Sequence, residues 1–284
     1  MAHSDFFLIL TCPQTLSIPM TTEKYLIVGL GVYGASTALH LLDADSQNPS
    51  ELTVVSHCIS LAPSEDISKI IRVDYTSARR MKEAIRAQEH WMNDDRFNQF
   101  YLPVGRIVAY DEMRLQTLDE IDQTRLHMGR HKRERLDGSI LAKIFGSTGA
   151  LSKLTFVHNE DDGLVEWEGC MQAMRDSVRE RCRENKESVF LETQVQDLVH
   201  CGERITAVTL ADDRRIGVAD KKVILAAGPW ITEILERSSI ERPPHSRIPI
   251  ATGVFAFILQ LNEEQTLFFK GKPALSQIGY GKGI

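Results

Sequence analysis

The sequence predicts an α/β fold, with one unit built on a parallel sheet and a second unit of the α+β type. Three observations carry this prediction. A glycine-spaced turn joins an apolar segment to a helix pattern within residues 24–42, an apolar segment follows at 51–55, and a segment that is apolar after Lys222 lies far downstream at 222–228. Short apolar runs that alternate with amphipathic helices are typical of βαβ units.

The glycine-spaced turn is the most informative feature. Tyr25–Val28 reads as a strand and leads into Gly29-x-Gly31-x-x-Gly34, after which apolar residues recur at helical spacing at Ala35, Ala38, Leu39 and Leu42. The first glycine permits a tight turn, the second lets the backbone approach a pyrophosphate, and the third lets the helix pack on the strand. The helix N-terminus then favours a phosphate anion. We therefore expect dinucleotide binding; the alternative is a glycine-rich turn without a function.

The end of the second strand departs from the usual pattern. In a dinucleotide-binding βαβ unit an Asp or Glu at this place holds the adenosine ribose. Here Ser56 stands there, followed by His57. A serine hydroxyl can bind a ribose hydroxyl, but less strongly than a carboxylate does. We keep Ser56 as a candidate cofactor residue.

Composition narrows the class of protein. The 284 residues allow one large domain or two modest ones, and the 43% hydrophobic and 25% charged content is ordinary for a soluble globular enzyme. The net charge of −6 gives no case for nucleic acid or an anionic membrane as a partner. The five cysteines form no CxxC pair, which indicates reduced thiols in an intracellular protein. Residues 1–20 read as a loose N-terminal extension, and no spacing of residues predicts a metal site.

The remaining elements follow from periodicity. We expect a helix at 78–92 with Met81, Ile85 and Trp91 facing inward, and a helix at 166–184 whose apolar stripe serves the core. Residues 111–136 have a charged, helical pattern, and the cluster Arg130–Arg135 reads as a solvated helix face rather than a nucleic-acid site. Strands are expected within 100–110 and at 188–198, 203–210, 215–218 and 222–228, with a turn at 212–213 and a helix after residue 229.

Several separate pieces together resemble a known family. They are GLGVYG at 29–34, SEDISKIIRVDY at 64–75, TQV at 193–195, KVILAAGPWI at 222–231 and IPIATGVFAFILQL at 248–261. From about residue 23 to its end the chain resembles the FAD-dependent D-amino-acid-oxidase-like superfamily, in the branch of monomeric sarcosine oxidase, fructosyl-amino-acid oxidase and saccharopine oxidase.

The resemblance implies two intertwined domains. A Rossmann-like FAD-binding domain is expected from the non-contiguous segments 21–95 and 155–240, and a mixed-sheet substrate domain from 96–154 and 241–284. Roughly the last third of the usual family chain has no counterpart in this sequence. We therefore expect a C-terminally truncated member with an incomplete substrate domain, whose binding of FAD and activity are in doubt.

The resemblance also assigns cofactor contacts. It implies FAD as the cofactor, held at the pyrophosphate turn by Gly29, Gly31, Val32, Tyr33 and Gly34. The backbone of Val195 is expected to meet the adenine, and Ala227 and Gly228 to form a second contact with the cofactor. Val195 can equally be a plain core valine, and Gly228 can simply end a strand.

Lys69 and Arg72 are the residues that the resemblance implies in catalysis. They are spaced i, i+3, so on a helix or turn they would project to one side. Arg72 matches the family's arginine that grips the substrate carboxylate, and Lys69 matches the basic residue against the isoalloxazine. The alternative is surface salt bridging to the nearby acids Glu65, Asp66 or Asp74. Asp74 and Tyr75 are expected to be structural.

The implied function is oxidation of the C–N bond of an amino-acid-derived secondary amine. The amine loses a hydride equivalent to the flavin, the imine hydrolyses, and oxygen is the electron acceptor. Two alternatives stay open: an NAD(P)-dependent dehydrogenase, and a non-catalytic fragment. We expect a cytoplasmic location, since family members are often peroxisomal but this C-terminus carries no SKL-type signal.

Overall fold

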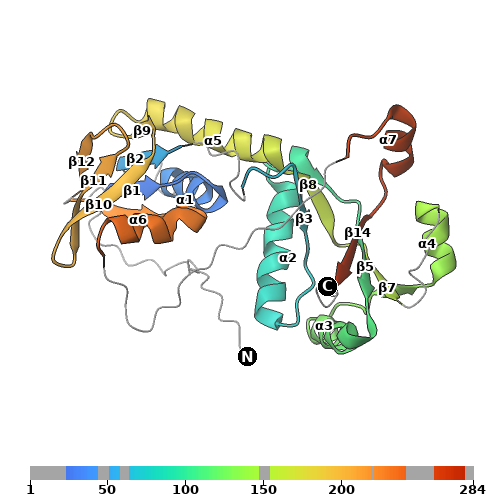
Figure 1. Cartoon of the computed structure of the whole chain (residues 1–284). Coiled ribbons are helices and arrows are strands. Elements are labelled where there is room, and N and C mark those ends of the chain that lie inside the picture. The colour runs from blue at the N-terminus through green and yellow to red at the C-terminus, as the bar shows by residue number, and fades with distance from the viewer. Residues whose placement is uncertain are drawn as a thin grey trace.

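The computed structural model describes residues 24–43, 51–57, 64–146, 154–218, 220–240 and 259–278 (Figure 1). The expected extension 1–20 and most of the segment 248–261 lie outside the described residues. The helices are α1 (Val32–Asp43), α2 (Ala78–Asn93), α3 (Leu115–His127), α4 (Gly138–Phe145), α5 (Trp167–Glu184), α6 (Ile231–Arg237) and α7 (Glu263–Phe269), with 3₁₀ turns η1 (Asn98–Phe100), η2 (Glu112–Arg114) and η4 (Gly228–Trp230).

Within the described residues the strands form four sheets. The first has the order β13 (Lys222–Leu225), β1 (Lys24–Val28), β2 (Glu51–Ser56), β9 (Val189–Glu192), and the second β10 (Val195–Cys201), β11 (Arg204–Leu210), β12 (Arg215–Gly217). The third has the order β14 (Ala274–Ile278), β5 (Arg106–Tyr110), β7 (Thr155–Asn159), β6 (Glu134–Leu136), and the fourth β3 (Ser68–Ile71), β8 (Gly163–Glu166), β4 (Tyr101–Leu102). The α/β class that the sequence predicts is confirmed.

The first sheet is parallel throughout and lies between two layers. Successive side chains of β1 point to opposite faces, as they must in a strand. Ile27 packs with α1 and α5, whereas Leu26 and Val28 pack with the second sheet and α6. Figure 1 shows α5 running along this sheet, with α6 and the β10–β12 sheet close to it. The result is a buried parallel sheet whose carboxyl ends are available to a ligand.

The two helices beside this sheet match the sequence patterns. Ala35, Ala38, Leu39 and Leu42 of α1 are at most 5% exposed, which confirms the helix after the glycine turn. The apolar stripe of α5, including Met171 and Met174, lies in the same cluster and is core, as expected.

In α2 the inward residue Met81 is fully buried, whereas Ile85 and Trp91 are only half-buried.

A helix covers each face of the third sheet. Ile107 and Ala109 of β5 pack with Leu141 of α4, and Val108 and Tyr110 pack with α3 on the opposite face. The small β3–β8–β4 sheet lies between this unit and the parallel sheet (Figure 1), and Val165 of β8 joins the core of α1 and α5. The expected domain division at residues 95, 155 and 240 stays a prediction. β7, which begins at Thr155, the first residue of the second expected FAD-binding segment, pairs with β5 and β6 in the third sheet.

Two expected elements differ from the structure. The helix expected across 111–136 is wrong beyond residue 127, because α3 ends at His127 and residues 134–136 form β6. Gly129, with φ of +72°, follows the helix and lets the chain reverse there. The expected strand at 188–198 is two strands, β9 and β10, which belong to different sheets. Within the described residues, no helix combines the length and apolar character needed to cross a membrane.

Candidate functional site

A cavity of about 540 Å³ lies at the carboxyl ends of the parallel strands. Its walls come from the glycine turn, from the ends of β2, β9 and β13, and from α5, α6 and the start of β10. In open parallel sheets, ligands bind outside the carboxyl ends of the strands, where the connections leave room. The cavity therefore lies where the βαβ pattern predicts a dinucleotide.

Two glycines of the turn cannot be replaced without moving backbone. Gly29 has φ of +94°, and a Cβ there would lie 2.6 Å from the carbonyl oxygen of Ala226. A Cβ on Gly34 would lie 1.9 Å from the carbonyl oxygen of Gly29, so α1 packs directly against the turn. Gly31 instead faces the cavity wall, where a Cβ would lie 3.0 Å from Ser64 Oγ. These positions match the predicted roles of turn, close packing and close approach.

Hydroxyls and one arginine brace the turn. The N–H of Leu30 donates to Ser56 Oγ at 3.0 Å, and the N–H of Val32, the first residue of α1, donates to Ser64 Oγ at 3.1 Å. Arg175 Nε donates to the Leu30 carbonyl at 3.2 Å, and its guanidinium pairs with Glu65. A hydroxyl and a guanidinium are thus held at the helix N-terminus, where an anion is favoured.

The cofactor residues expected from the sequence come together here, apart from one. Gly29, Gly31, Val32, Tyr33, Ser56, Val195, Ala227 and Gly228 all line the cavity. Gly34 lies behind the turn and packs against it. Val195 is 4% exposed and belongs to the core as well as lining the cavity, and its contact with adenine stays a prediction. Gly228 has φ of +56° and begins a 3₁₀ turn, so it does more than end the strand.

The structure separates Lys69 from Arg72. Both lie on or directly after the strand β3, so the expectation of a helix or turn is wrong. In a strand, residues three apart point to opposite faces. Lys69 lines the cavity and pairs with Asp66, the acid that the salt-bridge alternative included. Arg72 does not line the cavity; it is exposed, with its guanidinium 5.0 Å from the ring centroid of Tyr75.

Charged residues that sequence reasoning missed also line the cavity. Arg175 and Arg179 come from α5, Arg237 from α6, and Glu192 from the end of β9. The register of β2 and β9 brings Glu192 beside Ser56. The helical period of α5 marks its polar face, but only the fold shows that this face meets the glycine turn.

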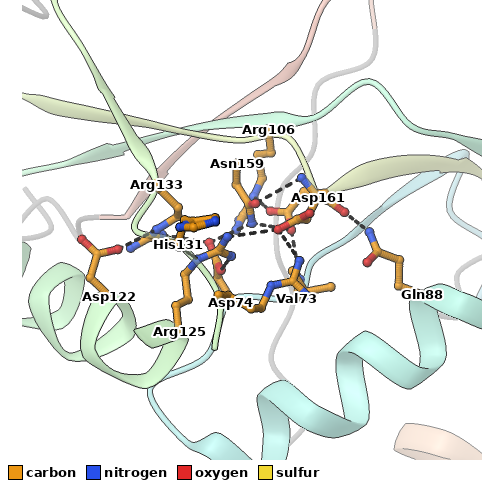
Figure 2. A network of polar contacts seen from close by, with 12 residues as sticks. Val73, Asp74, Gln88, Arg106, Asp122, Arg125, His131, Arg133, Asn159 and Asp161 are labelled. Atoms are coloured by element: carbon orange, nitrogen blue, oxygen red, sulfur yellow. Dashed lines mark hydrogen bonds and ion pairs between the residues drawn. The ribbon is translucent and has the colours of Figure 1, made fainter. Parts of the chain in front are cut away.

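A buried polar network fixes the segment after Arg72 (Figure 2). The N–H of Val73 donates to Asp162 Oδ1 at 2.9 Å. Asp74 accepts from Arg125 at 2.8 Å, Arg133 at 2.9 Å and Asn159 at 2.8 Å. Burial raises the pKa of Asp162, although Arg106 donates to it at 2.6 Å. Asp74 is therefore structural, as expected, and its contacts fix the backbone directly after Arg72.

The same network corrects the interpretation of the Arg130–Arg135 cluster. His131, Lys132 and Arg135 are exposed, and Arg135 pairs with the exposed Asp119. The side chain of Arg133 is 1% exposed and pairs with Asp74 and Asp122, while Arg130 pairs with Asp161. The solvated-face reading is wrong for Arg133, because its partners come from distant parts of the sequence.

The residues present fit an adenine dinucleotide. Gly29 and Gly31 of the turn line the cavity without side chains, and the cationic side chains of Lys69, Arg175 and Arg179 line it too. Trp167 lines the cavity, and within the described residues its buried indole N–H has no hydrogen-bond partner. An unsatisfied buried donor of a residue that lines a cavity is available to a polar ligand or to ordered water.

Comparisons with known proteins agree with this geometry. The chain is 26% identical to L-saccharopine oxidase from Schizosaccharomyces pombe over 276 residues, which cover 89% of this chain and 60% of that protein. Its fold is similar to a modified fructosyl peptide oxidase from Aspergillus nidulans, with a TM-score of 0.68, 19% identity, and coverage of 90% of this chain and 60% of that one.

Fructosamine oxidase (Amadoriase II) from Aspergillus fumigatus is similar at a TM-score of 0.67 and 15% identity, over 91% of this chain and 59% of that one. The chain thus spans about 60% of the length of these relatives. The model of the FAD dependent oxidoreductase family matches residues 24–274. The chain therefore belongs to the FAD-dependent oxidoreductase family.

Proposed function

We propose that this chain binds FAD and carries the cofactor-binding part of an oxidase that acts on an amino-acid-derived secondary amine, with oxygen as the electron acceptor. The observation that carries the proposal is the glycine turn at the carboxyl ends of a parallel sheet, with the cavity beside it. Family membership supports FAD over NAD(P), so the dehydrogenase alternative is not favoured. When bound, FAD supplies the two-electron oxidation of the substrate's C–N bond.

The protein's own residues have distinct roles in this proposal. The turn from Gly29 to Gly34 binds the diphosphate. The backbone of Val195 binds the adenine, and the segment Ala227–Gly228 makes a second contact with the cofactor. Lys69, which lines the cavity, is proposed to be the cation beside the flavin ring system. A fixed cation favours negative charge that develops next to it.

Arg72 is proposed to bind the substrate's carboxylate. Its neighbour Ile71 lines the cavity, and Arg72 itself is exposed just beyond it. Within the described residues no carboxylate pairs with Arg72, which stacks only on Tyr75. A guanidinium can bind a carboxylate through two parallel hydrogen bonds. The substrates named for the relatives, saccharopine and fructosyl peptides, suggest compounds to assay.

We also propose a cytoplasmic location. The thiols of Cys170, Cys182 and Cys201 are free, which is typical of a reducing compartment.

The experiment is to saturate the purified chain with FAD, remove free flavin, and record the visible spectrum. Retained flavin and peroxide formation with saccharopine or fructosyl amino acids are expected. Arg72→Gln should raise KM about tenfold or more, because charge-assisted hydrogen bonds are lost. Arg79→Gln, which removes an exposed arginine paired with Glu83, serves as the matched control. A chain that retains no flavin would refute the proposal; equal KM values for the two variants would refute the role of Arg72.

A further inference from the structure

The cofactor cavity lacks the acid expected at the end of β2. Ser56 occupies that place, and its Oγ already accepts a hydrogen bond from the N–H of Leu30 at 3.0 Å. This contact braces the glycine turn. The residue that follows, His57, is exposed and lines the cavity. Neither side chain offers the two acceptor oxygens with which a carboxylate binds a ribose diol.

The strand next to β2 supplies a carboxylate at the same level. β9 runs parallel to β2, and the register pairs Ser56 with Glu192. Both residues end their strands, and both line the cavity. Because parallel strands end on one edge of a sheet, Glu192 lies one strand-width from the usual position of the acid. Val195, the proposed adenine contact, begins the next strand three residues later.

Arg179 of α5 holds the side chain of Glu192. Its guanidinium lies 3.4 Å from Glu192 Oε1, 5.1 Å from the ring centroid of Phe190, and 3.0 Å from Asp176. Arg179 and Phe190 line the same cavity. The Glu192 side chain is 65% exposed, so its oxygens have acceptor sites left over after the ion pair.

We propose that Glu192 binds the ribose hydroxyls of the adenosine half of the cofactor, in place of the carboxylate missing from β2, and that Arg179 positions it. This inference rests on the proposed binding of FAD. A carboxylate accepts hydrogen bonds from the 2′- and 3′-hydroxyls, and it repels a 2′-phosphate. The recognition of ribose is thus moved by one strand, from β2 to β9.

The test compares ADP and 2′-deoxy-ADP as competitors of FAD on the full chain. Wild type should bind ADP about tenfold more tightly than 2′-deoxy-ADP, the loss expected for one charge-assisted hydrogen bond. In Glu192→Gln the ratio should fall close to one, because the amide keeps the shape but not the charge. Glu187→Gln, which removes an exposed carboxylate just before β9 and outside the cavity, should keep the wild-type ratio.

The outcomes separate the two proposals. If FAD binds but wild type does not discriminate between the competitors, or if Glu192→Gln discriminates as well as wild type, the role of Glu192 is refuted and FAD binding stands. If FAD does not bind at all, the proposed function and this inference fail together. The comparison within wild type needs no variant, so it does not depend on the folding of Glu192→Gln.

Discussion

Asp74→Ala should destabilise the protein strongly, because the Asp74 carboxylate is the shared acceptor of the buried network (Figure 2). The substitution leaves the guanidiniums of Arg125 and Arg133, 7% and 1% exposed, without this charge partner. Removing one partner of a buried ion pair costs about 3–5 kcal/mol. With a urea m-value of roughly 3 kcal/mol/M, the unfolding midpoint should fall on the order of 1 M.

The matched control is Asp119→Ala. Asp119 also pairs with an arginine of the 130–135 segment, but that pair is 3.5 Å apart and both side chains are more than half exposed. An exposed pair contributes about 0–1 kcal/mol, so the midpoint should scarcely move. Urea unfolding followed by circular dichroism measures both variants. Equal shifts for Asp74→Ala and Asp119→Ala would show that the buried network stabilises the protein no more than an exposed ion pair does.

Three further predictions concern the turn, the sheet and the thiols. Gly34→Ala should lower the thermal midpoint and weaken FAD binding, because its Cβ would lie 1.9 Å from backbone, whereas Gly217→Ala, in open space, should do neither. Hydrogen bonds from two lysines lower the pKa of Glu51, so its stabilisation is present above about pH 4.5 and is lost as the pH falls through the lowered value. Glu51→Gln should therefore destabilise more at pH 7 than at pH 3, and an equal loss at both would contradict this. Burial raises the pKa of Cys170 to about 11, so at pH 8 maleimide should label the exposed Cys201 and spare Cys170 in the native protein, as mapped by mass spectrometry.

Local patterns predicted the elements well where one signal dominates. The glycine spacing and the period of α1 are encoded within 20 residues, and the structure confirms both. The prediction that Lys69 and Arg72 project to one side is wrong, because four residues are too few to distinguish a strand from a turn. In a helix or turn, residues three apart share a face, whereas in a strand they point to opposite faces.

Long-range pairs were beyond prediction from local pattern. Arg133 looks like a surface residue in sequence, and it is buried because Asp74, 59 positions away, supplies the compensating charge. Glu192 lies beside Ser56 through the β2–β9 register, across 136 positions of sequence. The TQV piece at 193–195 predicts a cofactor contact close to Glu192, but nothing near Glu192 or Arg133 in the sequence indicates the partners Ser56 and Asp74.

The turn beginning at Gly29 is proposed to bind the diphosphate of FAD, and the other roles of the cavity depend on this contact. It can be tested by titrating the chain with FAD and with riboflavin, which lacks the diphosphate and adenosine. We expect FAD to bind and riboflavin to bind at least a hundredfold more weakly, about 3 kcal/mol less. Equal affinity for the two flavins would contradict it.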